Sequence, residues 1–301
     1  MSSEAPYLAN GVSPSILVQN YRSKLPPASA VHIRPGTGWR TLDLRELWRY
    51  RELLWFLALR DIKVRYKQTA LGVAWAFLQP VFTMVVFTIF FGRLGGMESR
   101  IQSSAPYTVY VLCALIPWQL FAFAVTQSSN SVVSSRTLLT KVYFPRLLIP
   151  IAPLLCGLVD FAVAFALLVP MMLFYGVVPG WGLVALPAFI VLALAASLAV
   201  GLWLSALNAI YRDVQYTIPF LTQFWMFLTP IAYPSSIVPE RWRLLYGLNP
   251  MAGVVDGFRW ALLGGEPPGP MLAVSTVVTL ILLVGGFYYF RRMERTFADV
   301  V

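Results

Sequence analysis

Charge is scarce in this sequence. Only 12% of the 301 residues are charged, against about 25% in an average soluble protein, and 58% are hydrophobic. So few charges exclude an ordinary soluble globular protein and indicate a lipid bilayer as the solvent. The formal net charge of +10 does not indicate a nucleic-acid partner, because the basic residues lie between apolar runs and form no polar domain of their own.

Residues for catalysis and metal binding are also nearly absent. The chain has one histidine, His32, and two cysteines, Cys113 and Cys156, which lie inside apolar runs. These counts exclude a Cys/His metal site, a disulfide framework and a Ser/His/Asp catalytic set in the apolar region. The sequence contains no G-x-x-x-x-G-K-[ST] phosphate loop. We therefore expect no catalytic residue, no cofactor and no metal, and a chain that is not an enzyme.

Long apolar runs are abundant. A helix that crosses the hydrocarbon core needs about 20 apolar residues. Six runs meet this need, at residues 71–92, 106–127, 147–178, 183–208, 214–232 and 271–290. The predicted fold is an all-α integral membrane protein with six transmembrane helices.

The basic residues predict the orientation of these helices. Six spans place both termini on one side of the membrane, and the segments on that side hold 18 of the 23 Lys and Arg residues. Basic residues are enriched in cytoplasmic segments, so both termini are predicted to be cytoplasmic.

The segments outside the spans predict three further features. Residues 44–67 alternate apolar and basic positions at three- and four-residue steps, which indicates an amphipathic helix that anchors to the membrane surface or also touches a cytoplasmic partner. Residues 233–270 are too apolar for a solvated loop and too broken to span, so we predict short half-inserted outer helices there. The predicted domains are a cytoplasmic tail at 1–43, an interface helix at 44–68 and a transmembrane domain at 69–301.

A basic and aromatic segment joins the second and third spans. Val142, Tyr143 and Phe144 lie between Arg136 and Arg146. Aromatic side chains that face the cytoplasm need a groove in a partner protein, whereas rings at headgroup level form an aromatic belt. Both interpretations remain open.

Aromatic and amide side chains share faces inside two spans. Trp75, Gln79 and Phe82 recur in the first span, and Phe220 and Phe224 recur in the fifth. Flat rings with few hydrogen-bonding groups suit a channel for sugars, although rings at helical spacing also pack or face lipid.

The charged residues near the cytoplasmic mouth suggest an anion site. Lys63, Arg65, Lys67 and Arg136 can bind an anionic group through charge-assisted hydrogen bonds, and the family resemblance given below implies that this group is the pyrophosphate of a lipid carrier. Asp160 is the acidic residue deep in a span, and it serves either a function or an interhelical pair.

Several motifs together carry a family resemblance that covers roughly residue 38 to the C-terminus. They are RDIKVRYKQTALGVAWAFLQPVFTMVVFTIFFGRL at 60–94, LLTKVYFPRLLIPIAP at 138–153, YRDVQY at 211–216, LTPIAYP at 228–234 and LNPM at 248–251. As a set they resemble the permease subunit of O-antigen and related polysaccharide ABC exporters, which are related to teichoic acid exporters.

The resemblance implies a function and partners. It implies an ABC-2 type homodimer in the bacterial inner membrane, bound to two copies of a separate ABC ATPase, that exports a polysaccharide carried on undecaprenyl pyrophosphate. The first and fifth spans would line the channel, and the 44–67 helix would meet the ATPase. A second ATPase contact would be made by Lys141, Tyr143, Phe144, Pro145 and Arg146. Membrane lipids are expected around the chain and no nucleic acid.

Two alternatives stay open. An ABC-2 permease for a drug or simple lipid would need a narrower and more uniformly apolar cavity. A membrane enzyme that modifies an envelope polymer would need catalytic charged residues on the outer side.

Overall fold

The structure is a computed structural model. It describes residues 44–67, 72–101, 105–265, 267–294 and 297, all within a compact unit that runs from Asp43 to Val301. The predicted tail at 1–43 lies outside the described residues, as do residues 68–71 at the predicted boundary between the interface helix and the transmembrane domain.

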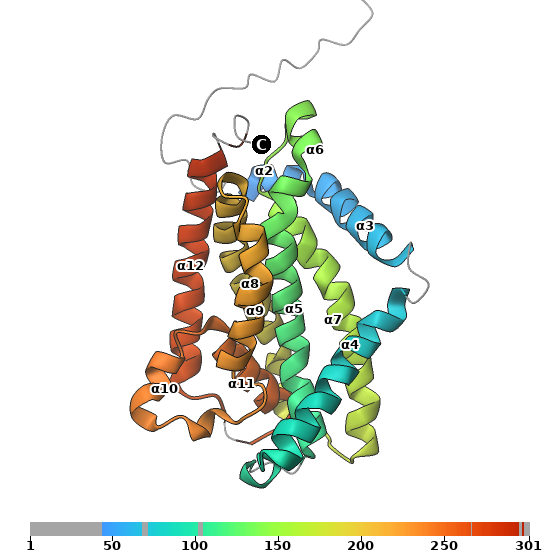
Figure 1. Ribbon diagram of the computed structural model, residues 1–301, viewed down its shortest axis with the longest axis vertical. Coiled ribbons are helices and arrows are strands. Elements are labelled where there is room, and N and C mark those ends of the chain that lie inside the picture. The colour runs from blue at the N-terminus through green and yellow to red at the C-terminus, as the bar shows by residue number, and fades with distance from the viewer. Residues whose placement is uncertain (1–43, 68–71, 102–104, 266, 295–296, 298–301) are drawn as a thin grey trace, which may run out of the picture. The chain divides into compact units, whose positions relative to one another are not determined.

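Every regular element in the described part of the chain is a helix (Figure 1). The short helices are α2 (Leu44–Arg49), η1 (Thr88–Leu94), η2 (Glu98–Arg100), α6 (Arg136–Lys141), η3 (Trp181–Ala185), η4 (Ser235–Ile237), α10 (Glu240–Tyr246) and α11 (Pro250–Leu263). The longer helices are α3 (Arg51–Lys67), α4 (Gly72–Phe87), α5 (Tyr107–Ser134), α7 (Leu148–Phe174), α8 (Leu186–Ile210), α9 (Val214–Leu228) and α12 (Pro270–Glu294). The prediction of an all-α membrane protein is confirmed.

Five helical segments of the described chain are long and apolar enough to cross a bilayer. They are Ala74–Leu94, Tyr107–Ser134, Leu148–Phe174, Trp181–Ile210 and Pro270–Glu294. The predicted fifth span corresponds to α9, which has only 15 residues and a length of about 22 Å. The count of six spans therefore stays a prediction, since α9 ends short of a full crossing.

Helix α5 is the centre of the bundle and packs against α7 and α8. Small residues let the backbones of α5 and α8 approach closely, as is usual for helices in membranes. An added Cβ at Gly201 of α8 would lie only 2.8 Å from the Ser128 Cβ of α5. The side chains of Val109, Leu112 and Phe121 are fully buried in the resulting core.

The segment that predicted an amphipathic helix forms α2 and α3, with a turn at Tyr50. Leu57 and Ala58 of α3 are buried against the rest of the chain, whereas Trp48 and Trp55 are exposed. Part of the apolar face that we expected to meet lipid therefore packs against α7. The tryptophans remain available for a membrane surface.

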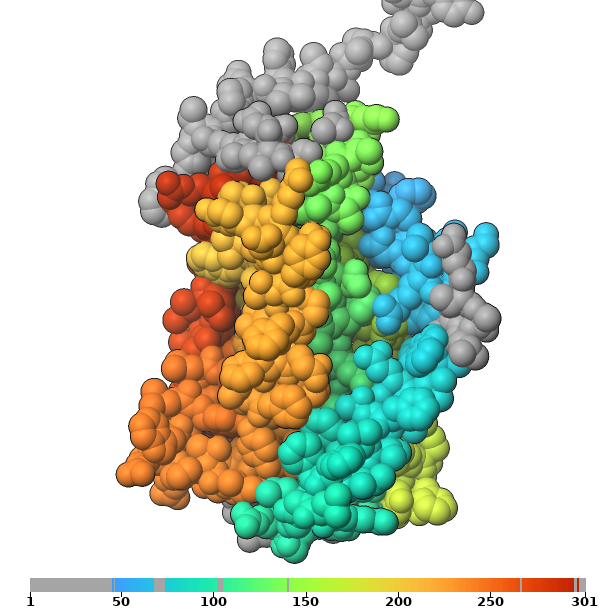
Figure 2. Space-filling model, viewed as in Figure 1, coloured from blue at the N-terminus to red at the C-terminus, as the bar shows by residue number. Residues whose placement is uncertain are grey.

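Two helices present apolar side chains outward on the same face of the bundle. Figure 2 shows α9 and α4 on the viewed face, and side chains of both line one groove. Phe82 and Phe90 of α4 and η1 and Phe220 of α9 are all at least 60% exposed. This face is defined here as the α4/α9 face.

Candidate functional site

A groove of about 930 Å³ runs between α4 and α9. Its floor is formed by α5, and α7 contributes residues at one end. The groove is lined by rings such as Phe82, Phe91 and Phe227 and by neutral polar side chains. The neutral polar side chains are Gln79, Thr83, Gln119, Thr126, Gln127, Thr222 and Gln223. Four of the eight glutamines of the chain thus line this one groove.

The structure brings only part of the predicted channel set into the groove. Gln79 and Phe82 line it, as predicted. Trp75, Phe220 and Phe224 do not line it and project from the α4/α9 face, where the rings of Phe220 and Phe224 stack with centroids 6.4 Å apart. A channel role for these three rings needs a surface that lies outside this chain, and it stays a prediction.

One end of the groove carries its two charged lining residues, Arg65 and Asp160. Arg65 Nη2 lies 2.8 Å from Asp160 Oδ2, and the Tyr66 hydroxyl donates a hydrogen bond to Asp160 Oδ1. The Arg65 guanidinium also lies 4.4 Å from the centre of the Phe123 ring. Burial and the neighbouring Asp160 carboxylate raise the pKa of Tyr66 above its usual range, so the hydroxyl stays a donor.

A second cavity of about 430 Å³ lies behind this pair, between α3, α5 and α7. Arg65, Phe123 and Gln127 line both cavities. Polar and apolar side chains contribute equally to its lining, and Ser131 and Ser134 of α5 are among the polar ones. The groove therefore adjoins, at this end, a second cavity of mixed polar and apolar lining.

The predicted headgroup residues have different surroundings. Lys63 and Lys67 are exposed on α3, while Arg136 is half-buried at the start of α6. Arg65 is held in the pair with Asp160. Anion binding by these four residues stays a prediction.

The segment predicted to contact the ATPase is only partly exposed. Tyr143 is 67% exposed and Lys141 is also exposed. Phe144 is 4% exposed and packs with Leu57 of α3 and Leu148 of α7, so our expectation that its ring projects outward is wrong. The Phe144 ring is buried within its own chain because α3 covers it.

The rest of this segment is anchored to the bundle. Pro145 is buried, and Arg146 Nη1 donates a hydrogen bond to the Glu294 carbonyl oxygen at the end of α12. A cavity of about 220 Å³ is lined by Leu139, Lys141, Val142, Tyr143, Phe144 and Arg146. Among the predicted contact residues, Tyr143 and Lys141 are thus the ones whose side chains can reach a partner directly.

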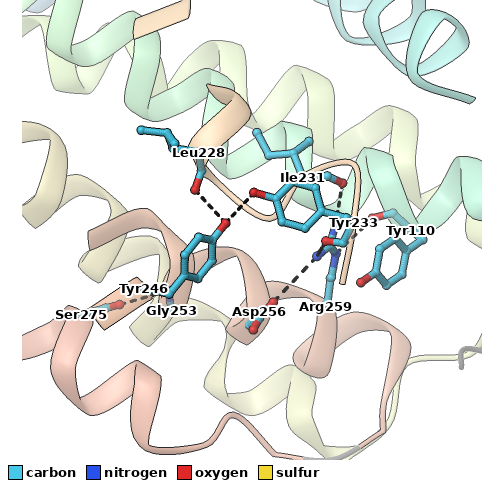
Figure 3. Close-up of polar contacts among 9 residues, drawn as sticks. All are labelled: Tyr110, Leu228, Ile231, Tyr233, Tyr246, Gly253, Asp256, Arg259 and Ser275. Atoms are coloured by element: carbon cyan, nitrogen blue, oxygen red, sulfur yellow. Dashed lines mark hydrogen bonds and ion pairs between the residues drawn. The ribbon is translucent and has the colours of Figure 1, made fainter. Parts of the chain in front are cut away.

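A cluster of polar contacts surrounds the break after α9 (Figure 3). Arg259 of α11 is buried, and its Nη2 donates to the Ile231 carbonyl oxygen at 2.7 Å. The Tyr107 hydroxyl donates to the Ala232 carbonyl oxygen at 2.7 Å, and the Tyr246 hydroxyl donates to the Leu228 carbonyl oxygen at 2.7 Å. Irregular backbone is tolerated at membrane depth where protein groups satisfy it, and these donors do so.

Asn249 explains why two of the sequence motifs meet here. Its side-chain oxygen accepts hydrogen bonds from the Met251 amide and from Trp225 Nε1, each at 3.0 Å. Its side-chain nitrogen donates to Thr229 Oγ1 at 3.0 Å. Asn249 thus caps α11 and ties the LNPM segment to the end of α9.

Comparison with known proteins assigns the family. The family model described as ABC-2 type transporter matches residues 52–263, which is more than half of the chain. The chain belongs to the ABC-2 type transporter family. The match includes the groove and the α9 break but ends before α12.

Curated relatives of this ABC-2 family member cover most of its length. The O-antigen export system permease protein RfbA of Myxococcus xanthus is 30% identical over 262 residues, which is 86% of this chain and 98% of that protein. A protein of the same name from Klebsiella pneumoniae is 27% identical, over 83% of this chain and 95% of its own length. The polysialic acid transport protein KpsM of Escherichia coli is 25% identical, over 79% and 92%.

Several groove residues of this ABC-2 protein were missed from sequence. Gln119, Thr126 and Gln127 line the groove. Their signal was present, since polar side chains within apolar runs rarely face lipid. Arg259 was likewise detectable as a basic residue between apolar neighbours, but its carbonyl partners lie 26, 28 and 149 residues away in the chain.

Proposed function

We propose that this ABC-2 protein is the membrane-spanning permease subunit of an ATP-driven exporter of lipid-linked polysaccharide of the O-antigen kind. The observation that carries the proposal is the groove, with its seven neutral polar side chains among aromatic rings. Rings stack on sugar faces, and scattered amides and hydroxyls exchange hydrogen bonds with a sliding polymer without holding one sugar tightly. The relatives named as O-antigen export system permeases agree with this chemistry.

The same groove disfavours a drug or simple-lipid permease. Such a substrate is mostly apolar, so it would leave four glutamines unpaired in a closed path. A glycan chain carries hydroxyl groups along its whole length and can pair with them. We therefore favour the polysaccharide substrate.

The proposed assembly is a homodimer with two copies of a separate ATPase. A second copy would cover the α4/α9 face and convert the groove into a closed channel, which gives Trp75, Phe220 and Phe224 a lining position. The exposed rings of this face support the proposal, because large apolar side chains exposed beside a groove are typical of a surface that a partner covers. Tyr143 and Lys141 would contact the ATPase, with the termini on that cytoplasmic side.

In this assembly the predicted headgroup site would lie at the cytoplasmic mouth of the channel. Lys63, Lys67 and Arg136 would bind the pyrophosphate of the lipid carrier, with Arg65 at the groove end. The purified chain alone is expected to show no ATP hydrolysis, which a coupled assay checks. Turnover that persists after removal of every other ATPase would contradict a separate energy source.

The decisive experiment changes the polarity of the groove at constant size. Gln79→Leu with Gln223→Leu should reduce surface polysaccharide at least tenfold in cells that lack the native gene, with normal amounts of protein in the membrane. Gln215→Leu is the matched control, since Gln215 lies on α9 outside the groove lining. Full export by the double variant would contradict the proposed path.

A bound-lipid measurement separates the substrate classes. The complex purified with its ATPase should carry a lipid pyrophosphate with attached sugars, which mass spectrometry identifies. A complex that carries only phospholipid or an apolar drug, with no polymer export, would favour the alternative ABC-2 substrate.

A further inference from the structure

The ion pair between α3 and α7 joins two elements with different predicted tasks. Helix α3 belongs to the predicted interface helix, and α7 forms one wall of the groove end. Tyr66 and Asp160 are 94 positions apart in the chain. An ionisable residue inside an apolar span is costly and indicates a function for which its partner should be sought.

Two separate attachments connect α3 to α7. The first is apolar and consists of Leu57 with Phe144, Leu148, Ile149 and Ala152. The second is polar and consists of Arg65, Tyr66 and Asp160. We call the second attachment the Asp160 clasp. Along α7 the two lie 8 to 12 residues apart, or about 12 to 18 Å, with the 430 Å³ cavity between α3, α5 and α7 beside them.

The clasp has properties that a single surface ion pair lacks. Both carboxylate oxygens of Asp160 are engaged, one by Arg65 and one by Tyr66. The side chain of Asp160 is 18% exposed and that of Arg65 is 38% exposed, so the carboxylate is shielded from water while the guanidinium is only partly so. The cation also stacks on Phe123 of α5, which ties a third helix to the same point.

We propose that the Asp160 clasp is a transmission joint that makes α3 and α7 move as one body. Asp160 is a positioning residue, because it acts on the groove through Arg65 and α7 and its role requires no contact with the substrate. With only the apolar attachment, α3 can rotate about that contact without moving the part of α7 that carries Asp160. With both attachments, a displacement of α3 by the ATPase moves the charged end of the groove as well. This inference rests on the proposed partner ATPase.

The test uses the complete complex and a charge-neutral variant. Asp160→Asn keeps the shape of the side chain but removes its charge. We expect normal assembly and basal ATP hydrolysis within twofold of the unmodified complex, with polysaccharide export per ATP reduced at least tenfold. Asp61→Asn is the matched control, because the Arg60–Asp61 pair has the same 2.8 Å separation but lies entirely within α3. The control should change none of the three quantities.

A charge exchange keeps the test valid if the single variant folds poorly. Arg65→Asp with Asp160→Arg should restore at least a third of the export lost in either single variant. A complex that assembles with Asp160→Asn and exports normally would overturn the proposal. Loss of assembly in Asp160→Asn without rescue by the exchange would also overturn it, because the complex would then require Asp160 itself and not the ion pair.

A distance measurement tests the joint without any substrate. Spin labels at Phe56→Cys on α3 and Val169→Cys on α7, with both native cysteines replaced by alanine, should give a narrow distance distribution. Asp160→Asn should broaden this distribution and Asp61→Asn should not. An unchanged width would overturn the joint, whereas a failure of the unmodified complex to export polysaccharide would overturn only the proposed substrate.

Discussion

Helices α5 and α4 have nearly the same mean hydropathy in their most apolar windows, 1.9 and 1.8 when η1 is included with α4. Their surroundings are nevertheless opposite. In the α5 window 78% of the residues are buried inside the chain, and in the α4 window only 17% are. Hydropathy measures the preference of a side chain for leaving water, and lipid satisfies that preference as well as protein does.

What separates the two helices is side-chain size and polarity. Helix α5 places Ser128 against Gly201 of α8, which permits close backbone approach. Helix α4 carries large rings outward and places Gln79 in the groove. We infer that an apolar span whose large side chains face outward, with an amide such as Gln79 in a neighbouring groove, forms part of a surface that another molecule covers. Predictions about the free energy of unfolding of the isolated chain test this contrast.

The largest effect is expected at the closest helix approach. Gly201→Leu should abolish recovery of folded protein, because its Cβ alone would lie 2.8 Å from the Ser128 Cβ and overpacking commonly costs about 1–3 kcal/mol or more. Size-exclusion chromatography of the detergent-extracted chain measures the result. Gly180→Leu is the matched control, since no atom lies within 4 Å of a Cβ there.

A smaller loss is expected at the break after α9. Arg259→Met removes the donor to the Ile231 carbonyl oxygen and leaves buried acceptors unpaired, which costs about 1–3 kcal/mol for each group. Unfolding followed by tryptophan fluorescence should show reduced stability. Arg241→Met serves as the control because Arg241 is exposed on α10. Equal stability of the two variants would show that the break does not depend on its buried donor.

Substitutions on the α4/α9 face should leave the stability of the isolated chain unchanged but reduce dimer formation and export. Phe220→Ala with Phe224→Ala should change the unfolding free energy of the isolated chain by no more than about 0.5 kcal/mol, as for other exposed sites. Dimer formation and export should nevertheless fall at least tenfold. For comparison, Phe121→Ala in α5 should destabilise the chain by about 3–5 kcal/mol, because that ring is fully buried. A stable dimer with full export in the double variant would remove this face from the channel.

The smallest effect is expected on the outer face of α12. Ile281→Ala and Val284→Ala shorten exposed apolar side chains that line neither large cavity. Stability, dimer formation and export should all stay unchanged within error. Loss of the dimer in these variants would show that the dimer interface lies on α12 and not on the α4/α9 face.

The sequence predicted more of the fold than of the site. Five of the six predicted runs coincide with helices long enough to span, with ends that agree to within seven residues, and the broken segment at 233–270 predicted short helices, which α10 and α11 are. The exposure of Phe144 was predicted wrongly, because a ring in a basic segment looks the same whether or not another helix covers it. The partner of Asp160 was left open for a similar reason, since it lies 95 positions upstream in Arg65.

Sequence alone determined the solvent of this protein, the approximate positions of its apolar helices and the scarcity of residues for chemistry. These properties add up residue by residue, so no partner position needs to be known. Only the tertiary structure decided which apolar face is buried, which glutamines share the groove and how α3 is joined to α7. Each of these depends on pairs of residues far apart in the chain, because packing, carbonyl capping and ion pairing act between neighbours in space.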